Sequence, residues 1–249
     1  MDNEKDAKIF ISHILDKSNE CFNKNIPCAT EFLDMQKQSL VHGIKREFRT
    51  EYFLWGGYDD AERKIIVFLP GYETDRSEFL RVMRAEHNSS SPLSHRDYLG
   101  SIMNLGIRRE FIGDILVCDS SADIIIKPEI EDFIYSNLSK AAKTTLSVSS
   151  HPISELRVPK PDVKEITFSV SSMRVDSVLA PAFGLSRSKA AEAVKAQLVY
   201  VNDILCLKPD KNVDFGDKIT LRRKGRVIIS DLGGKSRKGK TFVSAKVFK

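Results

Sequence analysis

The sequence predicts an α+β protein in three parts: N-terminal helices, a mixed domain of strands and helices, and a C-terminal domain. Three observations lead to this expectation. Apolar residues recur at helical spacing up to about residue 46, short apolar runs separated by turn residues follow up to residue 150, and a proline-bearing segment then interrupts the pattern. The expected boundaries are 1–48 for the helices, 49–151 for the mixed domain, 152–164 for a linker and 165–249 for the C-terminal domain.

Two helices are expected in the N-terminal part. Phe10 and Ile14 are among the apolar residues that repeat at helical spacing between charges. The second helix is expected to begin near Thr30, a residue type that caps helices well, and to end at Gly43.

The mixed domain combines strands with helices. Strands are expected at 53–55, 65–69, 79–85, 114–117, 124–127 and 144–148, and helices at 94–103 and 128–138. Ser94 and Asp97 have the spacing of a capping box, and Pro128 suits the first turn of a helix. This mixture is typical of a small α+β sandwich such as that of RNA-recognition-type domains.

Charge divides the chain unequally. Residues 166–249 contain 17 Lys and Arg against 7 Asp and Glu, whereas residues 1–165 contain 22 against 27. A basic C-terminal third on an acidic body favours a module that binds a polyanion. A solvated lysine-rich face is the alternative that charge alone leaves open.

Several classes of protein and site are not indicated. No apolar run reaches the length of a membrane helix, no secretion signal is visible, and the cysteines and histidines form no metal-binding pattern. We therefore expect a cytoplasmic protein with reduced thiols, without metal or cofactor, and monomeric. The segment Gly234-Lys235-Ser236 does not complete a nucleotide-binding loop, because Ile229 stands where that pattern needs glycine.

A motif in the C-terminal third resembles the S-four-like RNA-binding domain, also called the alpha-L motif. The family pattern has three parts, and the matching residues are Arg174, Asp176 and Leu179, then Ser186, Arg187 and Ala190, then Val199, Val201 and Asn202. Gln197 departs from it, because the family usually has glycine there. The resemblance implies two helices that present cations to RNA.

The longer resemblance is to YlmH-type proteins. It rests on the segments 55–58, 61–64, 94–100, 105–110, 112–115 and 170–174. Near the N-terminus Phe32-Leu33-Asp34 also fits, although Met35-Gln36-Lys37 replaces the usual continuation. The resemblance implies a ribosome-associated RNA-binding protein that acts on large subunits carrying stalled peptidyl-tRNA, with tRNA as a further candidate partner.

Candidate RNA-binding residues follow from the charge distribution and from the two resemblances, because cationic and hydrogen-bonding side chains bind phosphates. The main candidates are Arg174, Ser186, Arg187, Lys189, Lys195, Asn202, Arg222, Arg223 and Lys224. The secondary candidates are His95, Arg96, Arg108 and Arg109, for which helix capping and surface charge are equally good explanations. Asp176 is expected in a structural ion pair, since a carboxylate repels phosphate.

Two other functions remain as alternatives. One is an RNA-modifying enzyme such as a pseudouridine synthase, many of which carry an S-four-like domain. The usual arrangement places that domain first, and no second segment here resembles the one that holds their catalytic aspartate, so we expect no catalytic residues. The other is a cell-division-linked interaction scaffold, for which RNA would be dispensable.

Overall fold

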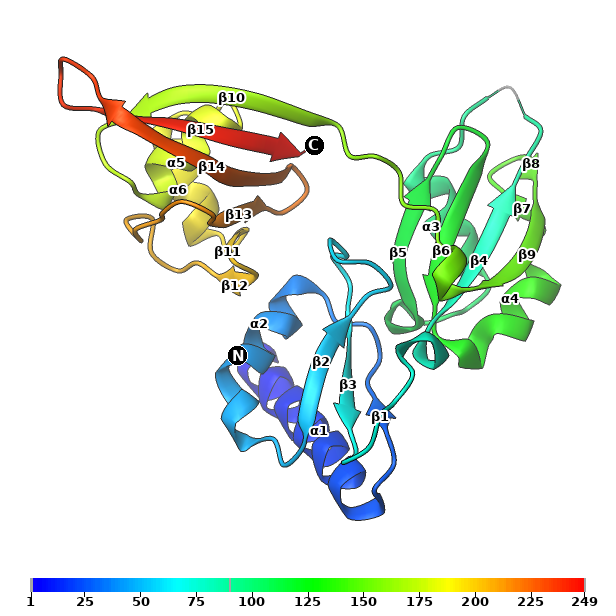
Figure 1. The fold of residues 1–249 in the computed structure, drawn as a ribbon. Coiled ribbons are helices and arrows are strands. Elements are labelled where there is room, and N and C mark those ends of the chain that lie inside the picture. Colours follow the sequence, from blue (N-terminus) through cyan, green and yellow to red (C-terminus); the bar gives the residue numbers. More distant parts are fainter. Residues whose placement is uncertain (1, 90, 249) are drawn as a thin grey trace. The chain divides into compact units, whose positions relative to one another are not determined.

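The computed structural model describes residues 2–89 and 91–248 and divides the chain into two compact units, Met1–Pro159 and Lys160–Lys249 (Figure 1). The helices are α1 (Asp2–Lys24), α2 (Met35–Ile44), α3 (His95–Asn104), α4 (Glu131–Asn137), α5 (Val175–Ala182) and α6 (Arg187–Lys195). Short 3₁₀ helices lie at Lys45–Glu47, Arg76–Phe79, Arg109–Phe111, Pro128–Ile130 and Ile153–Glu155. None of the described helices is both long enough and apolar enough to cross a membrane.

The strands of the first unit are β1 (Cys28–Ala29), β2 (Glu51–Trp55), β3 (Ile65–Leu69), β4 (Arg81–Glu86), β5 (Ile112–Val117), β6 (Ser121–Ile126), β7 (Lys140–Ala141), β8 (Thr144–Thr145) and β9 (Ser147–Pro152). Those of the second unit are β10 (Val163–Val170), β11 (Val199–Val201), β12 (Ile204–Leu205), β13 (Lys218–Leu221), β14 (Gly225–Lys235) and β15 (Thr241–Phe248). The α+β class predicted from the sequence is confirmed.

The N-terminal helices share a core with the first two long strands. The antiparallel sheet β1-β3-β2 packs on α1 and α2, and Ile14, Val41, Ile66 and Phe68 are buried between them. This differs from the boundary expected at residue 48, because alternate residues of β2 and β3 face the helices. Helix α2 also begins later than expected, after Asp34, whose carboxylate accepts a hydrogen bond from the Lys37 N–H at 2.9 Å.

The rest of the first unit has the βαββαβ order. Strands β4, β5, β6 and β9 form an antiparallel sheet in the order β5-β6-β4-β9, with α3 and α4 inserted after β4 and β6. Met83 and Ile124 point into the core beneath the helices. Val82 and Ile125 point to the opposite face, where Phe32 of the N-terminal part covers them.

The expected linker at 152–164 differs from the observed connection. Strand β9 extends to Pro152, and Ile153 in the next short helix is 6% exposed, so this part packs on the first unit. Strand β10 begins at Val163, which leaves residues 156–162 outside helices and strands.

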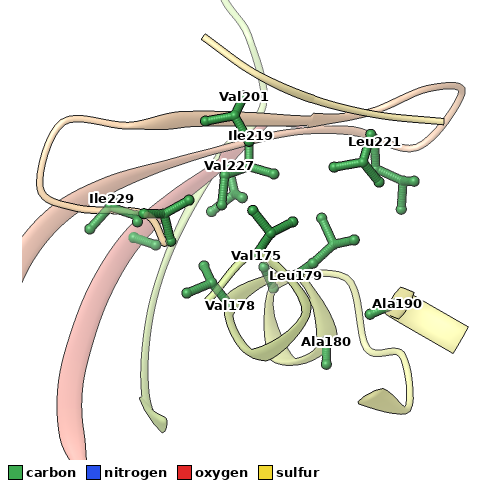
Figure 2. Packing of buried hydrophobic residues seen from close by; sticks show 14 of the residues in the cluster. Val175, Val178, Leu179, Ala180, Ala190, Val201, Ile219, Leu221, Val227 and Ile229 are labelled. Carbon is green, nitrogen blue, oxygen red and sulfur yellow. The ribbon is translucent and has the colours of Figure 1, made fainter. Parts of the chain in front are cut away.

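The second unit is a six-stranded antiparallel sheet with two helices packed on it, in the strand order β10-β15-β14-β13-β11-β12. Figure 2 shows Val175 and Leu179 of α5 directed at Ile219 and Val227 of the sheet. Ala190 of α6 is fully buried in the same cluster, and this small side chain lets the two helices approach closely. Apolar residues of both helices are therefore buried in one core with the sheet.

Candidate nucleic-acid interface

An aspartate joins the two helices of the second unit. Asp176, in the first turn of α5, is 4% exposed, and one of its carboxylate oxygens accepts from Arg174 Nε at 3.2 Å. The other accepts from Arg187 Nε, at the start of α6, at 3.0 Å. The structural ion pair expected for Asp176 is present, and it extends to a second arginine.

Two candidate cations at the start of α6 diverge. The Arg187 side chain is 54% exposed, yet its guanidinium turns towards Asp176. Lys189 is exposed and forms no ion pair with any described residue. Because residues two apart lie about 200° apart around a helix, the two cations do not share one face. Arg187 thus combines a structural contact with an accessible charge, while Lys189 is the freer of the two.

Two other candidates, Ser186 and Asn202, form hydrogen bonds to backbone N–H groups. The Ser186 side chain caps α6 by accepting from the Lys189 N–H at 3.2 Å. The Asn202 side chain donates to Asp217 at 2.8 Å and accepts from the Lys218 N–H at 2.9 Å. Both side chains remain exposed, but their hydrogen bonds shape the turns that carry their neighbours.

A basic turn lies next to the end of α6. Arg222, Arg223 and Lys224 connect β13 to β14, and the Arg222 N–H donates to the Leu198 carbonyl at 2.9 Å, just after the helix that ends with Lys195. All four cationic side chains are exposed, and within the described residues none has an ion-pair partner. We call these four residues the α6–β13 basic surface. Its unneutralised charge is the electrostatic feature that phosphate groups require.

The connection after α6 contains the residue that departs from the motif. Gln197 has φ +59°, so it occupies the left-handed region where glycine is favoured. Its N–H donates to the Val194 carbonyl at 3.0 Å. The turn therefore keeps the backbone shape that suits glycine, at a cost in strain.

The secondary candidates lie in the first unit and have unequal environments. Arg109 donates to the Gly113 carbonyl at 3.1 Å and shares the Ile112 carbonyl with Arg63. Burial, together with the Arg63 charge, lowers the pKa of Arg109 to about 10. Burial and the Arg109 charge also lower the pKa of His95. Arg109 thus bridges backbone carbonyls, and Arg96 is the more exposed cation.

The remaining cation of this set, Arg108, lies over an aromatic ring. Its guanidinium carbon is 4.8 Å from the centre of the Phe111 ring, although the residue is exposed. Arg108 therefore combines an aromatic contact with an exposed charge.

Segments that resemble YlmH-type proteins converge on Asp114. Its carboxylate accepts from the Tyr58 hydroxyl at 2.9 Å and from the N–H groups of Glu62 and Arg63 at 2.7 and 3.1 Å. Sequence reasoning missed this joint, because the segments are more than fifty positions apart. The sequence offered one signal for a structural role of Asp114: this single polar residue stands in an apolar strand, between Gly113 and Ile115.

Among the residues that the structure describes, the sheet of the βαββαβ part offers no open aromatic platform. RNA-recognition domains stack bases on aromatic residues of the sheet face. Here Arg84 and Asp123 occupy the central strands β4 and β6 as a buried pair, with side chains 6% and 2% exposed. Arg84 also donates to the Glu155 carbonyl at 2.8 Å. This face is therefore part of the interior of the first unit.

Comparisons with known proteins agree with the two resemblances. A family model described as "Putative RNA-binding domain in YlmH" matches residues 86–155, and the S4 domain matches residues 173–219. The ribosome-associated protein quality control protein P2 of Bacillus subtilis (strain 168) is 30% identical over 243 residues, which are 96% of this chain and 95% of that protein.

A solved structure is also similar. The cell division protein ylmH from Streptococcus pneumoniae matches with a TM-score of 0.51 over 62% of this chain and 95% of that one. Since the two are 17% identical, this similarity concerns the fold alone.

Proposed function

Since this chain belongs to the YlmH family, with the Bacillus subtilis quality control protein P2 as a relative along nearly its whole length, we propose that it is a non-catalytic RNA-binding protein. Its partner is ribosomal RNA of the large subunit, in the quality control of complexes that hold stalled peptidyl-tRNA. The observation that carries the proposal is the unneutralised α6–β13 basic surface of this chain, which begins within the residues that match the S4 domain and continues just past them.

The α6–β13 basic surface suits contact with the RNA backbone. Its four cationic side chains have no carboxylate partner among the described residues. Side chains cannot read bases in the narrow major groove of A-form RNA, so such a surface recognises shape and phosphates. Lys189 and the exposed part of Arg187 extend the positive charge along α6.

Geometry disfavours the enzymatic alternative. A catalytic aspartate needs an oxygen that can reach the substrate. Asp176 is 4% exposed, and arginines hold both of its carboxylate oxygens. We therefore assign Asp176 to structure and no residue to catalysis.

A salt titration tests the proposal. Large ribosomal subunits are mixed with the full chain and with the triple variant Lys195→Gln/Arg222→Gln/Lys224→Gln. Each lost phosphate contact should lower the log–log salt slope by about 0.7–0.9, so the triple variant should bind more weakly with a slope reduced by about 2. The matched control is Lys45→Gln/Arg46→Gln/Lys143→Gln, which removes the same charge from exposed positions of the first unit.

Sedimentation distinguishes the scaffold alternative. We expect the protein to sediment with large subunits and to be released by ribonuclease. Association that survives ribonuclease, or a triple variant that binds like the wild type, would contradict the proposal and favour a protein partner.

A further inference from the structure

The C-terminal hairpin lies beyond the residues that match the S4 domain, which end at 219. It consists of β14, β15 and the turn between them, and Figure 1 shows that turn projecting past the neighbouring strands. The turn is held by backbone bonds: the Ser236 N–H donates to the Lys240 carbonyl at 2.7 Å and the Gly239 N–H to the Ser236 carbonyl at 2.8 Å. We call this hairpin the arm.

Charge on the arm changes from its base to its tip. At the base, Lys246 pairs with Glu165 of β10 at 3.7 Å. At the tip, four exposed cations lie within six positions, and no acidic residue follows Asp231 in the sequence. These cations, Lys235, Arg237, Lys238 and Lys240, form no ion pair with a described residue. Their mutual repulsion is relieved when a polyanion binds.

An aromatic side chain lies beside the tip. Phe242 is 43% exposed and alternates with Val243, which faces the core. Its neighbours across the sheet are small: Ser169 lies opposite on β10, and a break in the β14–β15 register places Gly233 and Gly234 on the other side. Among the described residues, the strand partners opposite Phe242 are therefore all small.

Glycine matters at this break. A Cβ added to Gly233 would lie 3.1 Å from Phe242 Cβ, which is tighter than an ordinary contact. A side chain here would compete with Phe242 for space. The arm thus combines an accessible ring with four adjacent cations.

We propose that the tip of the arm is a second RNA-binding site, in which an unpaired base stacks on Phe242 and the flanking phosphates bind the four cations. Stacking on an aromatic ring tolerates any base, and basic side chains beside it track the backbone. The inference deepens the proposed function, since it rests on RNA as the partner. It assigns single-stranded RNA to the arm, separately from the α6–β13 basic surface.

Three variants of the full chain separate the two components. Phe242→Leu removes the ring, Phe242→Tyr retains it, and the tip variant changes Lys235, Arg237, Lys238 and Lys240 to Gln. The charge-matched control changes Lys45, Arg46, Lys140 and Lys143 to Gln in the first unit. Thermal melting of each variant checks folding, because all the changed side chains are exposed.

The probes are a short oligouridine and large ribosomal subunits. With oligouridine, Phe242→Leu should weaken binding about tenfold with an unchanged salt slope, while Phe242→Tyr binds like the wild type. The tip variant should lower the slope by about 3, and the charge-matched control should not. Oligouridine binding that is unaffected by Phe242→Leu, or a control that loses as much as the tip variant, would overturn the inference.

The two probes also distinguish this inference from the proposed function. If the wild type binds oligouridine through the arm but not large subunits, the proposed function fails and the inference stands. If it binds large subunits but the arm variants bind both probes like the wild type, the inference fails and the function stands. If the wild type binds neither probe, both are wrong. In a further outcome, a tip variant loses binding to large subunits while ribonuclease treatment of the subunits does not release the wild type. That result would indicate that the arm binds a protein instead of RNA.

Discussion

At the scale of single residues, Asp176 shows how one carboxylate organises the corner between α5 and α6. It lies in the first turn of α5, where negative charge is favoured by the helix dipole. Its two oxygens orient Arg174 and Arg187, and Ser177 Oγ donates to it at 3.3 Å. The buried acid therefore orders two cations that are themselves partly exposed.

Removing the charge of Asp176 should destabilise the second unit. Asp176→Asn leaves the two guanidinium groups without their anion, and we expect a loss of about 2–3 kcal/mol in the free energy of unfolding. Urea denaturation measures it, with Glu192→Gln on the exposed side of α6 as control. Equal midpoints for Asp176→Asn and the wild type would show that the pair contributes nothing.

Gln197 offers a substitution that should stabilise the second unit instead of destabilising it. Because its φ of +59° is strained for a residue with a Cβ, Gln197→Gly should stabilise the second unit by about 0.5–1 kcal/mol, after the greater entropy of glycine in the unfolded chain is allowed for. Gln197→Ala keeps the strain and should remain close to the wild type. Thermal melting compares the three proteins, and a less stable glycine variant would contradict the interpretation.

At the scale of elements, Asp114 ties β5 to the loop between β2 and β3. The loop folds tightly at Gly56, where an added Cβ would collide with the Cβ of Ala61. Three donors from this loop then reach Asp114. The segments that resemble the family therefore build a joint inside the first unit, which explains their residue types without assigning them to RNA.

Loss of the joint should be costly. Asp114→Ala removes the acceptor of two N–H groups and of the Tyr58 hydroxyl, so we expect about 3 kcal/mol of destabilisation. Tyr58→Phe removes one of these bonds and should cost about 1 kcal/mol. Chemical denaturation measures both, with Asp119→Ala as an exposed control. If Asp114→Ala were no less stable than Tyr58→Phe, the N–H bonds would not contribute.

At the scale of the whole molecule, the two units have separate apolar cores. The apolar clusters of the first unit are built from residues up to 156, and that of the second unit from residues 166–247. Because none of the clusters formed by the described residues draws on both units, each should fold by its own burial of apolar surface.

A fragment tests this independence. Residues 160–249 expressed alone should melt cooperatively, within a few degrees of the corresponding transition in the full chain. Calorimetry of the fragment and the full chain makes the comparison. A fragment without a cooperative transition would show that the second unit depends on the first for its stability.

The sequence by itself determined what depends on local pattern. Helical spacing identified α1, the capping-box positions Ser94 and Asp97 identified the start of α3, and the three-part motif identified α5, α6 and the strand after them. The Ser94 N–H does donate to the Asp97 carboxylate, at 2.8 Å. These features depend on residues a few positions apart, so the chain records them directly.

Only the tertiary structure decided what depends on distant partners. It assigned β2 and β3 to the N-terminal helices, turned Arg109 towards backbone carbonyls, and placed Arg187 against Asp176. It also exposed Phe242, whose strand pattern alone does not say which face is covered. The physical reason is that burial and charge pairing depend on which segments meet, and a periodic pattern does not specify the neighbour across the core.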